Sequence, residues 1–193
     1  MKNSVAKQVA YIGVMFALMF VVLTLETLVS RIFLFIPPAI LSIPLAIALS
    51  IYADKKEMFV GGSILGVCSW ILSFIIGLIP FYNPLVSILP RIIMGIVAYT
   101  VYIGIQKLTK NSSKMFVKEI LPISIAGAVA VLSNTVGVLG MMSLFAGDNA
   151  FLQTTLSVII GINFTLEFIM GIVLVPILVR TIKKITSKKV VID

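Results

Sequence analysis

Long apolar segments fill most of this chain, and short polar segments separate them. Of its 193 residues, 60% are hydrophobic and only 11% are charged, which is too little charge to cover the surface of a water-soluble domain. A helix needs roughly 20 apolar residues to cross about 30 Å of hydrocarbon. A chain of this length therefore holds about six membrane-spanning helices and little else. We expect a single integral membrane domain over residues 1–193.

Prolines and polar clusters divide the apolar sequence into six predicted helices. Pro37 and Pro38 separate the first helix from the second, residues 54–57 form a hydrophilic turn, and residues 80–84 interrupt the chain with two prolines. The predicted helices run over residues 6–29, 39–53, 58–79, 85–106, 120–145 and 151–182. The sequence thus predicts an all-α membrane protein, a bundle of six transmembrane helices.

The positive charge is unevenly distributed over the polar segments. With six spans, thirteen of the fifteen Lys and Arg residues fall on one side of the membrane, and only Arg31 and Arg91 fall on the other. Segments rich in Lys and Arg stay in the cytoplasm, so we expect both termini, the 54–57 turn and the 107–119 loop to be cytoplasmic. The net charge of +8 is then a topology signal, and no folded basic domain is left to bind nucleic acid.

Residue patterns that support catalysis are missing. The chain has no histidine, and its one cysteine, Cys68, lies in an apolar run. It contains no phosphate-binding glycine loop, no HExxH and no Cys/His spacing suited to a metal. We therefore expect no metal or cofactor in this chain and no ATPase, metalloenzyme or protease activity. No second similar half is present to supply the inverted repeats of a self-sufficient secondary transporter.

Polar residues inside the predicted spans are the candidates for function, because a charge in a bilayer usually faces a cavity or a partner. Arg91 lies roughly 9 Å below the outer end of the fourth helix, where it either points inward towards a carboxylate or extends to the headgroups. Glu167 lies near the middle of the sixth helix and shares a helical face with Asn163. Glu167 either contacts a ligand or pairs with Arg91 or a neighbouring helix.

Other polar residues have a structural and a functional interpretation. Asn134, midway along the fifth helix, either completes a cavity wall or forms an interhelical hydrogen bond. Asn83 either caps the fourth helix or lines the entrance of a site, with Phe81 and Tyr82 as a lid. Glu26 and Arg31 are expected to pair locally at the outer end of the first helix.

Small residues recur at intervals of four in the first helix. Gly13 and Ala17 form one pair, and Ala6 and Ala10 form another. This spacing lets two helix backbones approach closely, either within the bundle or against another protein.

The run from Asn83 to Gly95, NPLVSILPRIIMG, resembles the NPLVSxLPRxxxG segment of S components, the substrate-binding subunits of energy-coupling factor vitamin transporters. The start of the first helix, residues 11–18, is also similar to that family, as are the length, the six predicted spans and the basic tail. The segment is most like the subgroup resembling pantothenate transport proteins.

The resemblance implies a non-catalytic subunit in a bacterial cell membrane. Such a subunit captures a vitamin at the extracellular side and delivers it with a transmembrane coupling subunit and two cytoplasmic ATPases, which use ATP and magnesium. It implies that Gly13 and Ala17, or Ala6 and Ala10, contact the coupling subunit. With pantothenate as ligand, Arg91 would take the carboxylate.

The remaining polar candidates would then serve the rest of pantothenate. Asn134, Asn163 and Glu167 would take its hydroxyls and amide, while Tyr82 covers its methyl groups near Asn83. Alternatives are another vitamin on the same scaffold, such as folate, pyridoxine or a hydroxymethylpyrimidine thiamine precursor. A small membrane enzyme or a structural subunit is a further alternative.

Overall fold

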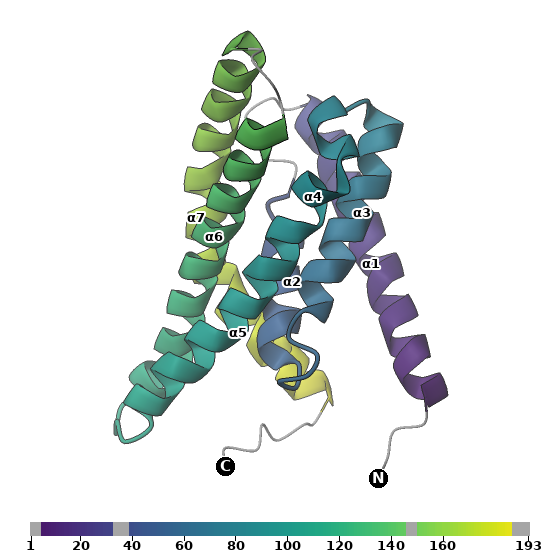
Figure 1. The fold of residues 1–193 in the computed structure, drawn as a ribbon. Helices are drawn as coiled ribbons and strands as arrows, with labels where there is room; N and C mark the ends of the chain where they lie inside the picture. Colours follow the sequence, from purple (N-terminus) through teal and green to yellow (C-terminus); the bar gives the residue numbers. More distant parts are fainter. Residues whose placement is uncertain (1–4, 33–38, 146–149, 187–193) are drawn as a thin grey trace.

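The computed structural model describes residues 5–32, 39–145 and 150–186, and all of the regular structure in these residues is helical (Figure 1). Each of the six predicted helices coincides with a helix of the structure. These helices are α1 (Val5–Ile32), α2 (Ser42–Tyr52), α3 (Val60–Ile76), α5 (Leu89–Thr109), α6 (Leu121–Phe145) and α7 (Ala150–Thr186). Three single-turn elements complete the described fold: η1 (Ile79–Tyr82), α4 (Pro84–Ser87) and the π-helical turn η2 (Phe116–Ile120).

The fourth predicted helix differs from the structure, which divides it at Ile88 into α4 and α5. Pro90 causes the division, because a proline has no N–H to donate to the carbonyl four residues earlier. That carbonyl belongs to Val86, the third residue of α4. The sequence placed Pro90 in the early turns of a continuous helix, and the break is a correction to that prediction.

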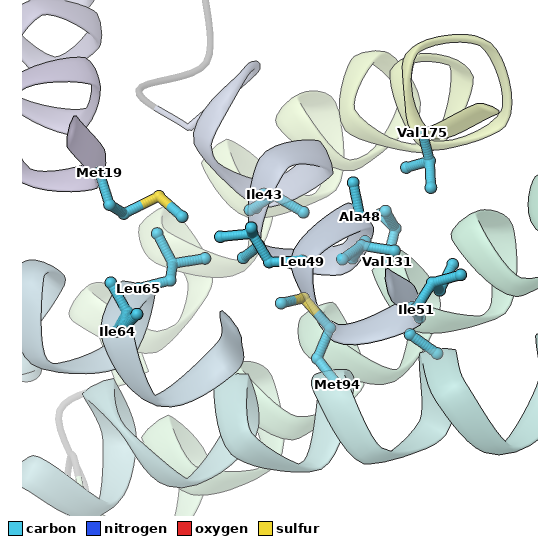
Figure 2. Close-up of a cluster of buried hydrophobic side chains, with 14 of the residues drawn as sticks. Met19, Ile43, Ala48, Leu49, Ile51, Ile64, Leu65, Met94, Val131 and Val175 are labelled. Atoms are coloured by element: carbon cyan, nitrogen blue, oxygen red, sulfur yellow. The ribbon is translucent and has the colours of Figure 1, made fainter. Parts of the chain in front are cut away.

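Helix α2 lies at the centre of the bundle. Its sequence, SIPLAIALSIY, has no charged residue on any side, and nine of its eleven residues are buried. Figure 2 shows Ile43, Ala48 and Leu49 between Met19 of α1 on one side and Val175 of α7 on the other. A short helix that is apolar all round is stable when other helices cover every face. Helices α1, α3, α5, α6 and α7 all contact α2 and together cover it.

Two helix crossings are so close that only glycine fits. A Cβ at Gly62 of α3 would overlap the carbonyl oxygen of Arg91 on α5 and lie 2.7 Å from its carbonyl carbon. A Cβ at Gly127 of α6 would overlap the carbonyl oxygen of Gly171 on α7. The backbone of α3 therefore touches that of α5, and the backbone of α6 touches that of α7. These contacts fix where Arg91 and the polar residues of α7 lie along the bundle.

Four stretches of the described chain are long and apolar enough to cross a membrane: Ile12–Ile32, Pro84–Thr109, Phe116–Phe145 and Asn163–Lys184. Helices α2 and α3 are apolar but shorter. In Figure 1 one end of the bundle holds the α2–α3 connection, the α5–α6 connection, the start of α1 and the end of α7. Elements η1 and α4 lie at the other end. We call these the lysine end and the α4 end.

Candidate ligand-binding site

Pro84 and Pro90 bracket the segment that leads to Arg91, and side chains stabilise its irregular backbone. Asn83 is the N-cap of α4, and its Oδ1 accepts a hydrogen bond from the Leu85 backbone N–H at 3.0 Å. The structural interpretation of Asn83 as a helix cap is therefore confirmed. Its position at the α4 end also leaves it near the start of the segment that holds Arg91.

The Arg91 guanidinium replaces the backbone donor that Pro90 lacks. Its Nη1 donates to the Val86 carbonyl at 2.9 Å and to the Ser87 carbonyl at 2.8 Å. The Val86 carbonyl is the one that the N–H of residue 90 would serve in a continuous helix. In a membrane no water is at hand to satisfy such a carbonyl, so a nearby side-chain donor stabilises the break. Arg91 is partly buried, and its guanidinium is held at the α4 end by the carbonyls of Val86 and Ser87.

A side-chain donor also compensates for a proline on α7. Pro176 lies inside that helix and leaves the Ile172 carbonyl without its usual donor. Ser124 of α6 donates its Oγ–H to this carbonyl at 3.1 Å. At both prolines, a side chain serves the orphaned oxygen, and at Pro176 this contact joins two helices.

The aromatic segment before α4 lies against Arg91 on one side and α3 on the other. The Arg91 guanidinium carbon is 5.3 Å from the centroid of the Phe81 ring, a cation–π distance. Tyr82 stacks on Phe74 of α3 with ring centroids 4.6 Å apart, and Trp70 donates its indole N–H to the Tyr82 carbonyl at 2.9 Å. Phe81, which the sequence predicts as part of a lid with Tyr82, is thus the aromatic ring in contact with Arg91. Tyr82 is tied to α3.

Asn134 of α6 has an unused acceptor in the interior. The residue is 5% exposed, and its Oδ1 has no hydrogen-bond partner among the described residues. A Cβ built at Gly137, one turn further along α6, would lie 3.0 Å from the Pro90 side chain. Asn134 is therefore one turn from the contact between α6 and the start of α5. A buried amide oxygen without a partner costs free energy, on the order of 1–3 kcal/mol.

Glu167 and Asn163 of α7 are both partly buried. Glu167 interacts electrostatically with Arg91 and, with the opposite sign, with Glu26. No ion pair within 4.0 Å joins Glu167 to Arg91. Glu119 and Arg180, by contrast, do form an ion pair, at 3.5 Å. The structure therefore brings Arg91 and Glu167 within electrostatic range but leaves a gap between their charged atoms.

Glu26 is the interior charge that the sequence argument placed wrongly. Its carboxylate is 7% exposed and accepts hydrogen bonds from the backbone N–H groups of Leu41 and Ser42, where α2 begins. Arg31, its expected partner, donates instead to the Ile76 carbonyl of α3 at 2.9 Å. The sequence showed an acid in an apolar helix but not its partners. The groups that bind Glu26 and Arg31 are the start of α2 and the end of α3, which are separate from α1 in the sequence.

The small residues of α1 lie on a surface that the rest of the chain leaves uncovered. Gly13 and Ala17 are exposed, and a Cβ at Gly13 would meet no atom within 4 Å. Ala10 is also exposed, whereas the side chain of Ala6 lies outside the residues described in that detail. These pairs therefore do not serve close packing inside the bundle at the positions that the structure describes.

Comparison with known proteins identifies no family: no protein-family model matches the chain, and no curated protein is similar to it. The fold defines the chain as a helical, apolar, multi-pass bundle with a few polar residues in its interior.

Proposed function

We propose that this chain is the substrate-binding S component of an energy-coupling factor transporter in a bacterial cell membrane. In this proposal six helices span the membrane, both termini are cytoplasmic, and a vitamin binds between Arg91 and α7. The chain itself performs no catalysis, and two partner ATPases with ATP and magnesium supply the energy through a transmembrane coupling subunit. The exposed small residues Gly13 and Ala17, with Ala10 and Ala6, form the coupling contact.

One observation carries the proposal: an apolar bundle holds a gap between a guanidinium and a carboxylate. Among the described residues, Arg91 donates hydrogen bonds only from Nη1, to Val86 and Ser87, which leaves its other N–H groups for an anion. Glu167 has no ion-pair partner among the described residues, and the Asn134 Oδ1 has no donor. A ligand with an acid at one end and hydrogen-bond donors at the other would satisfy both sides.

Pantothenate has this distribution of groups and is our first candidate. Its carboxylate would bind Arg91 beside Phe81, and its hydroxyls and amide N–H would bind Glu167, Asn134 and Asn163. Asn83 would lie at the entrance. The methyl groups, which flank the hydroxyls, would lie near α6 and α7 and away from Tyr82, which stacks on Phe74 of α3. The arrangement at the lysine end supports the orientation, because the segments with Lys55, Lys107 and Lys118 gather there (Figure 1), opposite to α4.

The experiment is calorimetric binding of pantothenate and of panthenol, its uncharged alcohol analogue, to the purified protein. We expect pantothenate to bind more tightly, and Arg91→Gln to remove the difference between the two compounds. Glu167→Gln should weaken both compounds and leave the difference intact, which makes it the matched control. Equal binding of both compounds to the unaltered protein would remove Arg91 from the site.

A hydroxymethylpyrimidine thiamine precursor is a second candidate. The unpaired acceptors Glu167 and Asn134 favour a ligand with an amino group, and this compound offers one without any carboxylate. Native mass spectrometry of the protein as purified would separate the two candidates by the mass of the retained compound. Copurification of a coupling subunit and two ATPases would separate an S component from a membrane enzyme or a structural subunit.

A further inference from the structure

The last two turns of α1 carry two charges that bind opposite ends of two neighbouring helices. Glu26 binds the start of α2, and Arg31 binds the end of α3. We propose that these contacts form a clasp that fixes this end of α1 and that the rest of α1 pivots about it. The clasp is defined as the hydrogen bonds of Glu26 to Leu41 and Ser42 and of Arg31 to Ile76.

The Glu26 contact supplies a cap that α2 does not make for itself. Leu41, which precedes α2, has no side-chain acceptor, and the first N–H groups of a helix have no partner within it. Both carboxylate oxygens of Glu26 serve the Ser42 N–H, at 3.3 and 3.2 Å. A negative charge is also favoured at the positive end of a helix dipole. Because Glu26 is buried, water does not take over its hydrogen bonds to the first N–H groups of α2 when the carboxylate moves away.

The Arg31 contact has the opposite polarity at the end of α3. Gly77 ends that helix with a φ of +76°, and the N–H groups of Gly77 and Leu78 both bind the Ser73 carbonyl. The Ile76 carbonyl is left for Arg31, and a positive charge is favoured at this negative end of the helix. Arg31 is exposed, so Glu26 is the stronger half of the clasp.

The other half of α1 has one weaker polar contact among the described residues, from the Cys68 Sγ–H of α3 to the Phe16 carbonyl at 3.9 Å. Ile12, Gly13 and Val14 are exposed, and α1 diverges from α3 towards the lysine end in Figure 1. From Met15 onward the helix packs by apolar side chains, of which Met19 is fully buried. Apolar contacts have no required direction, whereas hydrogen bonds to a carboxylate do. The divergent half can therefore move while the clasp holds α2 and α3.

The test measures the position of α1 by double electron–electron resonance on the full chain in lipid nanodiscs, in a Cys68→Ser background, which keeps a donor for the Phe16 carbonyl. One spin-label pair, at Val14 and Leu108, reports the divergent half. A second pair, at Leu28 and Leu85, reports the clasp end. All four side chains are exposed apolar residues. The variants are Glu26→Ala, Glu26→Gln and Arg31→Gln, and the matched control is Ser30→Ala, whose hydroxyl binds Thr27 within α1.

We expect a broader distance distribution for the Val14 pair than for the Leu28 pair in the unaltered clasp. Glu26→Ala should broaden the Leu28 pair and make amide exchange at residues 41–45 on the order of tenfold faster. Glu26→Gln, which keeps one acceptor, should have a smaller effect, and Ser30→Ala should have none. Equal widths for the two pairs would overturn the pivot. A Leu28 pair unchanged by both Glu26→Gln and Arg31→Gln would overturn the clasp. Neither outcome depends on a ligand.

Discussion

Gly62→Ala is the sharpest test of the helix contact beneath Arg91. The added Cβ would lie 2.7 Å from the Arg91 carbonyl carbon, about 0.8 Å closer than the optimum of roughly 3.5 Å between carbon atoms. The atoms in the way are backbone, so α3 and α5 must separate instead of rearranging a side chain. Overpacking of this kind costs about 2–3 kcal/mol, and the better helix propensity of alanine offsets about 1 kcal/mol.

The net expectation for Gly62→Ala is a loss of about 1–2 kcal/mol in the free energy of unfolding. Gly104→Ala is the control, because a Cβ at Gly104 on α5 would meet no atom within 4 Å. That control should gain about 1 kcal/mol from helix propensity alone. The two variants should therefore differ by about 2–3 kcal/mol, which corresponds to roughly 4–12 °C in melting temperature for a chain of this size.

Thermal unfolding in detergent, followed by the fluorescence of Trp70, measures this difference. Trp70 is the only tryptophan in the chain and lies two turns from Gly62 on the same helix. Because the displaced atom is the carbonyl of Arg91 itself, ligand affinity should fall together with the melting temperature. If Gly62→Ala melts at the same temperature as Gly104→Ala or above it, α3 and α5 do not touch at Gly62.

Three further predictions concern single polar contacts. Arg91→Gln should cost about 1–3 kcal/mol of stability by leaving the Val86 carbonyl unsatisfied. Adding Pro90→Ala should restore part of this loss, because it supplies a backbone N–H. A double-mutant cycle of melting curves measures the coupling, and additive effects of the two substitutions would contradict the shared carbonyl. Asn134→Leu should leave stability equal or higher, because it removes a buried oxygen without a partner, while calorimetry shows weaker ligand binding; a clear loss of stability would mean that Asn134 has a structural partner. Asn83→Ala should lower stability by about 1 kcal/mol through loss of the α4 cap, whereas an unchanged melting temperature would show that the cap contributes nothing.

The helices of this protein were predictable because their causes are local. Runs of apolar residues and the breaks at Asp54 and Pro84 placed the six helices, and most of the ends differ by a few residues from the structure. The split at Ile88 was missed because it depends on how much of a helix survives before Pro90. That outcome is decided by side chains that serve the freed carbonyl, as Arg91 does for Val86.

The candidate site was predictable in its residue types but not in its partners. A charge or an amide inside an apolar helix stands out in the sequence, and this singled out Arg91, Asn134 and Glu167. Phe81 was predicted only as part of a lid, because aromatic rings are common in such chains and only its distance of 5.3 Å from Arg91 identifies its partner.

The sequence by itself determined the apolar helical segments, the sorting of positive charge and the few polar residues that an apolar interior must accommodate. Each of these follows from composition and spacing along the chain. Only the tertiary structure decided that the partner of Glu26 is the start of α2, where the sequence suggested Arg31. It also decided that Gly62 lies directly against Arg91. Those contacts join residues far apart in sequence, and they depend on how closely two backbones approach, which no local pattern encodes.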